Sequence, residues 1–172
     1  MVFLGIGSNL GDKEKNIADA FFLLEKYFVF LETASLYISK PLYHKDQPDF
    51  INTVFRGIAP TGFTPSSLLK TALDIENRLG RKRDPFVPKG PRIIDIDILL
   101  FGQKRLNTET LVIPHPGIKE RQFVLKPLLE LENRLTDPLS LQEYLLFTDK
   151  QDNQGVYLYK SCRYIEKYKY TG

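Results

Sequence analysis

The stretch Gly90–Gly102, GPRIIDIDILLFG, is mostly apolar and rich in β-branched residues, yet it carries two aspartates. Asp95 and Asp97 are two residues apart, and in an extended chain such residues point to the same face of a strand. The neighbouring isoleucines would then pack on the opposite face. Two like charges on an apolar strand need water, cationic partners or a metal ion, because a buried, unpaired carboxylate is costly.

The size and composition of the chain predict one soluble, intracellular domain. Its 172 residues are enough to bury roughly two thirds of the surface of the unfolded chain. The single cysteine, Cys162, cannot form an internal disulfide bond, and the N-terminal residues lack the pattern of a signal peptide. The longest apolar runs are too short to cross a membrane. We therefore expect a cytoplasmic protein that does not contact a membrane.

Helical and extended patterns follow one another along the chain without a regular βαβ rhythm. One helix is predicted after the N-cap residue Asp12, with apolar residues at helical spacing as far as Phe28, and another from Thr64 to Gly80. A third helix is expected to start near Arg121. Extended segments are expected at residues 2–6, 30–39, 50–58, within 90–102, and at 111–116. This order favours a single α+β domain, residues 1–172, with a mostly antiparallel sheet.

A cationic loop precedes the strand with the two aspartates. Residues 81–92, RKRDPFVPKGPR, include five cations, one anion and three prolines. An isolated cluster of this kind is most simply a solvated charged run. Its length and its position before Asp95 favour a lid or binding segment instead. Arginines suit bidentate contacts with phosphate and paired carboxylates suit Mg²⁺, so the combination predicts a nucleoside triphosphate site.

Three other site types fit the sequence poorly. The segment Gly5–Gly11, GIGSNLG, does not have the glycine spacing of a dinucleotide fingerprint, because Leu10 stands where the third glycine should be. We interpret it as a tight turn in which Ser8 and Asn9 bond to the backbone. The P-loop pattern is absent from the sequence. Two histidines and one cysteine argue against a zinc site, and a net charge of +3 is too small to argue by itself for nucleic-acid binding.

Five motifs occur in an order that is similar to one known family. They are GSNLGD (7–12), DQPDFINTV (46–54), IENRLGRKRD (75–84), GPRIIDIDILLFG (90–102) and IPHPGIKERQFVLKPLLEL (113–131). Together they resemble 6-hydroxymethyl-7,8-dihydropterin pyrophosphokinase, of folate biosynthesis. The resemblance implies a ferredoxin-like sandwich with helices flanking the sheet. It also implies a monomer that transfers the terminal pyrophosphoryl group of ATP to the pterin hydroxymethyl group and releases AMP.

The resemblance implies roles for individual side chains. The expected catalytic residues are Arg81, Arg92, Asp95 and Asp97, of which the two aspartates hold two Mg²⁺ ions. The residues implied in ATP binding are Leu69, Glu76, Arg81, Arg83, Arg92, His115 and Arg121. The residues implied in pterin binding are Ser39, Leu42, Phe50, Asn52, Asp95 and Phe123. We expect Arg81 and Arg83 to swing in with a closing lid after ATP binds.

Simpler structural interpretations exist for several of these residues. Glu76 could be an ordinary exposed helix residue, Leu69 could belong to the core, and His115 could be a turn residue. A metal-dependent phosphodiesterase could use the same carboxylates, but it would not need the asparagine and phenylalanines of the pterin set. A ferredoxin-like RNA-binding module could use the basic loop and the tyrosine-rich tail, but it would leave the aspartates unexplained. The tail from about residue 154 lies outside the resemblance, and we expect it to pack on the domain surface rather than bind nucleic acid.

Overall fold

One antiparallel sheet organises the chain. The computed structural model describes residues 1–42, 46–82, 90–148, 154–162 and 165. The strands of the sheet are β1 (Val2–Ser8), β2 (Phe30–Thr33), β3 (Leu36–Ser39), β4 (Phe50–Ile58), β5 (Asp95–Phe101) and β8 (Tyr157–Lys160). Their order is β5-β1-β4-β3-β8, with β2 also pairing with β4. A separate small ribbon pairs β6 (Leu106–Asn107) with β7 (Val112–Ile113).

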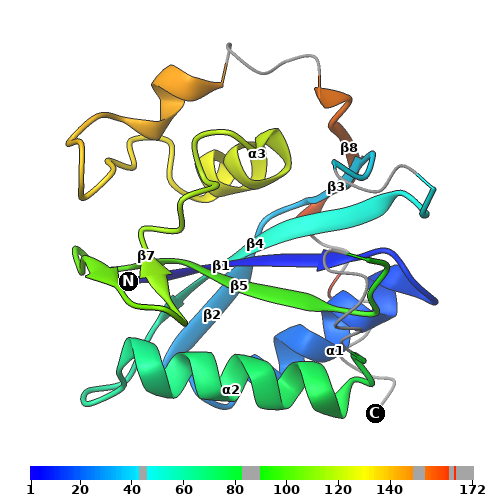
Figure 1. Cartoon of the computed structure of the whole chain (residues 1–172), viewed down its shortest axis with the longest axis horizontal. Coiled ribbons are helices and arrows are strands. Elements are labelled where there is room, and N and C mark those ends of the chain that lie inside the picture. Colours follow the sequence, from blue (N-terminus) through cyan, green and yellow to red (C-terminus); the bar gives the residue numbers. More distant parts are fainter. Residues whose placement is uncertain (43–45, 83–89, 149–153, 163–164, 166–172) are drawn as a thin grey trace.

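Helices cover both faces of this sheet (Figure 1). On one face lie α1 (Lys13–Glu25) and α2 (Pro65–Arg78), and on the other lie α3 (Gln122–Leu131) and the short 3-10 helix η1 (Tyr144–Phe147). Two helices on one face of an antiparallel sheet with β5 beside β1 and β1 beside β4 form the ferredoxin-like arrangement. The predicted α+β sandwich is therefore confirmed. None of the described helices is long and apolar enough to span a membrane.

The first two helices begin where the sequence predicts. Asp12 accepts a hydrogen bond from the backbone N–H of Lys15, and Thr64 forms a capping box with Ser67. The predicted end of the first helix is wrong, because α1 stops at Glu25 and Phe28 lies beyond it. The chain turns there, since the N–H of the next residue, Val29, donates to the carbonyl of Ile58 at the end of β4.

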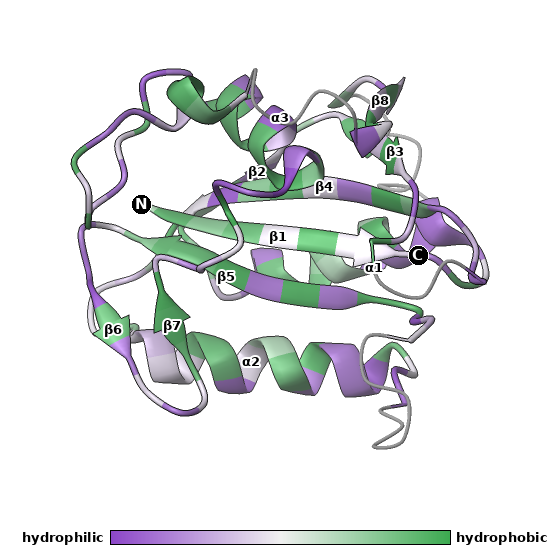
Figure 2. Cartoon of the chain, turned by 45° about the horizontal axis from the view of Figure 1, so that its top comes forward, coloured by the Kyte–Doolittle hydropathy of each residue, from purple (hydrophilic) through white to green (hydrophobic). Residues whose placement is uncertain are grey.

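The two faces of the sheet carry different cores. The face under α1 and α2 is mostly apolar, with residues such as Ile6, Ile96 and Ile98. On the other face, Phe3, Val54 and Leu99 pack in one cluster with residues of α3. Farther along the same strands, this face carries two glycines on β1, an asparagine on β4 and the two aspartates on β5. The predicted separation of aspartates from isoleucines is confirmed, and Figure 2 shows the alternation along β5.

The described part of the tail lies on this domain. β8 is the edge strand and pairs with β3. Lys160 Nζ donates to Glu14 Oε1 of α1 at 2.6 Å, and Ile165 is buried in the core beneath the sheet. Residues 154–162 therefore contact elements that are more than a hundred positions earlier in the chain.

Candidate active site

A pocket of about 290 Å³ lies on the α3 side of the sheet, beside the N-terminal end of that helix. Ten of the residues predicted from the sequence line it. They are Leu42, Phe50, Asn52, Arg81, Arg92, Asp95, Asp97, His115, Arg121 and Phe123. These residues come from β4, β5, the start of α3 and the loops beside them. The fold thus brings together motifs that are up to about eighty positions apart in the sequence.

Glycines form the part of the pocket floor that β1 contributes. Gly5 and Gly7 pair with Asp97 and Asp95 of β5, and Gly7 also pairs with Asn52 of β4. A Cβ atom on Gly7 would lie 3.1 Å from Asn52 Oδ1, so glycine leaves room for that side chain. Gly5 belongs to the strand predicted at residues 2–6, but the predicted turn is wrong for Gly7, because β1 continues to Ser8. Their spacing of two, which places them on one face, is the signal that could have revealed the floor.

Asp95 is held by two arginines. Its Oδ1 accepts a hydrogen bond from Arg81, and its Oδ2 lies 3.0 Å from Arg92 Nη2. The structure thus provides cationic partners for one of the two carboxylates that the strand carries. Arg81 lies in the pocket wall in this arrangement, and its movement with a lid after ATP binds stays a prediction. The Nε–H of Arg92 is buried and has no hydrogen-bond partner among the described residues, so it is a donor available to an anionic ligand.

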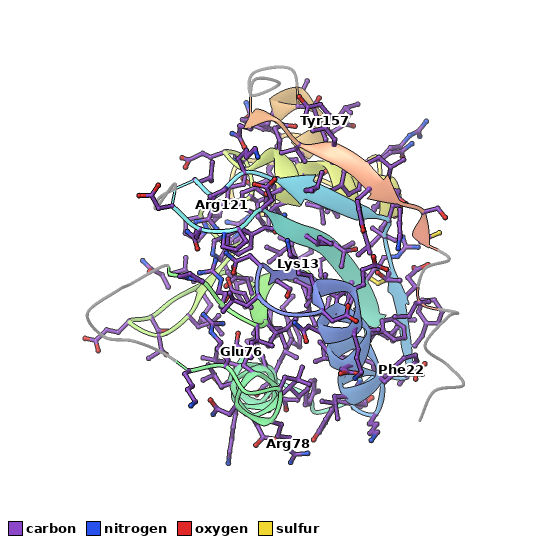
Figure 3. The ribbon with its side chains drawn as sticks, turned by 90° about the vertical axis from the view of Figure 1, so that its right-hand side faces the viewer. Lys13, Phe22, Glu76, Arg78, Arg121 and Tyr157 are labelled. Atoms are coloured by element: carbon purple, nitrogen blue, oxygen red, sulfur yellow. The ribbon has the colours of Figure 1, made fainter. Side chains whose placement is uncertain are left out.

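Glu76 supports the site from beneath the sheet. Its side chain is only 3% exposed, and its Oε1 accepts hydrogen bonds from Arg81 and from the backbone N–H of Ile96. Figure 3 shows Glu76 pointing from α2 toward the sheet, whereas Arg78 of the same helix points away from it. The interpretation of Glu76 as an exposed helix residue is therefore wrong, and the structure does not place it among the pocket-lining residues.

Asp97 is the second carboxylate of the pair. Burial and the neighbouring charge of Asp95 raise the pKa of Asp97 to about 7, against the opposing effects of Arg121 and Arg92. A cation beside it would favour the charged form. Within the described part of the chain, no group of three or more His, Cys, Asp or Glu side chains is placed to hold a metal ion. Two carboxylates suit Mg²⁺, which completes its coordination with water and substrate phosphates.

His115 and Arg121 form a further part of the pocket wall. His115 Nδ1 accepts a hydrogen bond of 3.0 Å from the backbone N–H of Gly117. Burial and the charge of Arg121 lower the pKa of His115 to about 4, so the ring is neutral at pH 7. The proton of that neutral ring is on Nε2, which can donate to a ligand. A Cβ atom on Gly117 would lie 2.6 Å from Arg121 Nε. Glycine at this position therefore leaves room for the guanidinium group of Arg121.

The remaining wall combines an amide with aromatic rings. Asn52 is 4% exposed, and its Nδ2 donates to Ser39 Oγ at 3.0 Å. Ser39 thus holds Asn52 in place and is itself outside the pocket lining. The guanidinium carbon of Arg92 lies 5.1 Å from the centre of the Phe50 ring, while Phe123 comes from the first turn of α3. An amide and aromatic rings in one pocket suit a flat heterocycle with polar edges.

Sequence reasoning missed two polar residues of this region. Gln47 lines the pocket, and its Oε1 accepts a hydrogen bond of 3.0 Å from Asn9 Nδ2. Asn9 Oδ1 also accepts from the backbone N–H of Arg92 at 2.7 Å. Asn9 was expected only to stabilise a turn, but it joins the loop before β4 to the loop before β5. No local sequence pattern predicts these contacts, because the partners are 38 and 83 positions away from Asn9.

Leu69 is partly buried against the core under the sheet and does not line the pocket, so its role near ATP stays a prediction. Arg83 lies outside the described residues.

Comparison with known proteins identifies the family. Residues 3–133 match the family model of 7,8-dihydro-6-hydroxymethylpterin-pyrophosphokinase (HPPK). A 2-amino-4-hydroxy-6-hydroxymethyldihydropteridine pyrophosphokinase from Bacillus subtilis is 33% identical over 99% of this chain and 97% of its own length. The folic acid synthesis protein fol1 of Pneumocystis carinii is 43% identical over 93% of this chain, but the chain spans only 22% of that relative.

The structural comparison agrees at the level of the fold. A crystal structure of an HPPK-DHPS in complex with substrates matches 87% of this chain with a TM-score of 0.68 and 13% sequence identity, over 42% of its own chain. The same architecture therefore occurs within a longer protein. The family model covers most of this chain, and the Bacillus relative is matched over nearly its whole length. The chain belongs to the 7,8-dihydro-6-hydroxymethylpterin-pyrophosphokinase family.

Proposed function

We propose that this chain transfers the pyrophosphoryl group of ATP to the hydroxymethyl group of 6-hydroxymethyl-7,8-dihydropterin and releases AMP, as a step of folate biosynthesis. The observation that carries this proposal is one pocket that combines a carboxylate pair, three arginines, an amide and two aromatic rings. The family membership supports the same activity. The expected monomeric state, cytoplasmic location and lack of nucleic-acid binding stay predictions.

The arginines are proposed to hold the phosphates of ATP. Arg81 and Arg92 then exchange their bonds to Asp95 for bonds to phosphate oxygens, and the unpartnered Nε–H of Arg92 gains an acceptor. Arg121 and the Nε2 donor of His115 add contacts from the wall formed by residues 115–121. Glu76 keeps Arg81 near the pocket during this exchange, because its own buried carboxylate bonds to the same guanidinium. Leu69 and Arg83 keep the roles near ATP that the resemblance implies.

Asp95 and Asp97 are proposed to hold two Mg²⁺ ions together with ATP. When bound, such ions neutralise phosphate charge and polarise the attacking hydroxyl group. For this role Asp97 loses its proton and Asp95 releases its arginines, and both changes are favoured when a cation and a triphosphate arrive together. Since the described protein groups offer few metal ligands, we propose that the metal binds mainly as its complex with ATP.

The pterin is proposed to lie between Phe50 and Phe123, with Asn52 bonding to its polar edge. Ser39 fixes the amide of Asn52, so the group is already oriented before the ring arrives. The backbone near Leu42 adds contacts at the rim. Positioning and charge neutralisation then account for catalysis, with the hydroxyl of the pterin held near the phosphates.

The decisive assay incubates the chain with ATP, Mg²⁺ and 6-hydroxymethyl-7,8-dihydropterin and analyses the nucleotide product. We expect AMP and a pterin diphosphate in equal amounts, with no turnover when the pterin is omitted or the metal is chelated. ADP or free phosphate as the product would contradict the proposal. Pterin-independent hydrolysis of a phosphodiester would support a metal-dependent phosphodiesterase instead.

Removing the amide in the pocket should affect one substrate selectively. Asn52→Ala is expected to weaken pterin binding by about 1–3 kcal/mol, because polar atoms of the ring lose their partner. Binding of an ATP analogue should be nearly unchanged. Calorimetry with each ligand measures both effects, and Ser39→Ala, which only frees the amide, should give a smaller loss in the same direction. Equal losses for both ligands would show that Asn52 has a structural role.

A further inference from the structure

The N-terminus of α3 carries two side chains of the site but lacks a cap from its own sequence. Arg121 is the N-cap residue, and its side chain makes no capping hydrogen bond. Its side chain lines the pocket instead, together with that of Phe123. The first N–H groups of a helix have no partners within the helix. A side chain from another part of the chain can supply an acceptor for this end of α3.

Gln154 supplies that acceptor from beyond the segment that matches the family model. Its Oε1 accepts a hydrogen bond of 3.0 Å from the backbone N–H of Gln122, and its Nε2 donates to the carbonyl of Glu120 at 2.7 Å. These two backbone groups belong to the residues on either side of Arg121. One side-chain amide thus bonds to the backbone immediately before and immediately after Arg121.

Further hydrogen bonds join α3 to residues that come before and after Gln154 in the chain. The Gln122 side chain is buried, and its Nε2 donates to the carbonyls of Phe147 and Thr148 at 3.2 and 3.0 Å. One turn later, Lys126 Nζ donates to the carbonyl of Val156 at 2.9 Å. Gln122 and Lys126 are four residues apart and therefore lie on one face of the helix. The contacts of Gln154 are the ones nearest to the pocket.

We propose that Gln154 is a positioning residue for Arg121, a role that rests on the proposed contact of Arg121 with the phosphates of ATP. An arginine side chain has many rotamers. Contact with a phosphate therefore requires a fixed backbone position as well as a suitable rotamer. Gln154 fixes the backbone position of Arg121 by bonding to the peptide groups on both sides of it. The segment after α3 thereby contributes to the active site without lining it.

A double-mutant cycle between Gln154 and Arg121 tests this role. Gln154→Ala is expected to lower kcat/KM for ATP by about fivefold, because Arg121 is then held less precisely relative to the phosphates. In an Arg121→Ala background the same substitution should change kcat/KM very little, because the group that it positions is gone. Gln154→Glu retains the acceptor for Gln122 but cannot donate to Glu120, so it should recover part of the loss.

Lys126→Met is the matched control, because it removes a contact of the same segment one turn away from the pocket. It should lower Tm about as much as Gln154→Ala while kcat/KM for ATP stays unchanged. Independent effects of Gln154→Ala and Arg121→Ala, or an equal loss of kcat/KM in Lys126→Met, would overturn the positioning role. An inactive wild-type chain would instead count against the proposed function. The cycle is then measured on binding of Mg²⁺ with α,β-methylene-ATP by calorimetry, where additive losses again overturn the proposal.

Discussion

Asp97→Ala and Asp95→Ala are each expected to lower the turnover number by at least about 100-fold, because each removes a group proposed to hold the metal complex of ATP. Both side chains lie on the face of β5 opposite the isoleucine core. The loss of turnover should therefore be found in variants that still fold. Turnover is measured as AMP formation, and the far-ultraviolet circular dichroism spectrum and Tm report on folding.

The two aspartates should differ in their effect on stability. Asp95→Ala takes from Arg92 its ion-pair partner and from Arg81 one of its two carboxylate partners, whereas the buried Asp97 has a raised pKa and is a poorly solvated charge. We expect Asp97→Asn to leave Tm unchanged or to raise it, and Asp95→Asn to lower it. Asp74→Ala is the control, since it breaks an exposed ion pair with Arg78 on α2 and should leave both turnover and Tm nearly unchanged. Near-normal turnover in either site variant contradicts the proposed metal-holding role.

Arg81→Met is expected to lower the single-turnover rate by at least about tenfold, or roughly 1.4 kcal/mol of barrier. Binding of a non-hydrolysable ATP analogue should change much less. In the ground state Arg81 only exchanges Asp95 for a phosphate, and such an exchange of one ion pair for another gains little free energy. Charge that develops on the phosphates during transfer makes the contact stronger in the transition state. Arg81→Lys should recover part of the rate, because an ammonium group cannot make the planar two-bond contact.

Arg81→Met should also destabilise the fold, because it removes the cation that bonds to the buried Glu76 carboxylate. The expected loss is about 3 kcal/mol in the free energy of unfolding. Adding Glu76→Gln should restore much of this stability, since a glutamine oxygen can still accept from the Ile96 N–H. It should not restore the rate. If stability and rate recover together in the double variant, the effect of Arg81 on turnover is only structural.

The sequence alone was sufficient where the relevant interactions are local. Alternation along β5 placed Asp95 and Asp97 on one face, and the caps at Asp12 and Thr64 marked the starts of two helices. Strand alternation and caps depend on residues within a few positions, so the physical rule can be applied to the sequence directly. The ordered motifs also identified the family, which the comparisons confirm.

Other features of the site depend on tertiary packing. Glu76 was assigned to the nucleotide or to an exposed helix face, yet its carboxylate lies under β5 and holds Arg81. Gly7 was interpreted as part of a turn, but it forms the pocket floor together with Gly5, because β1 lies between β4 and β5. The amide of Gln154 meets backbone groups more than thirty positions earlier. The packing of the helices on the sheet decides which distant groups pair. Burial removes water as an alternative partner, so only nearby protein groups can satisfy a charge or a hydrogen bond.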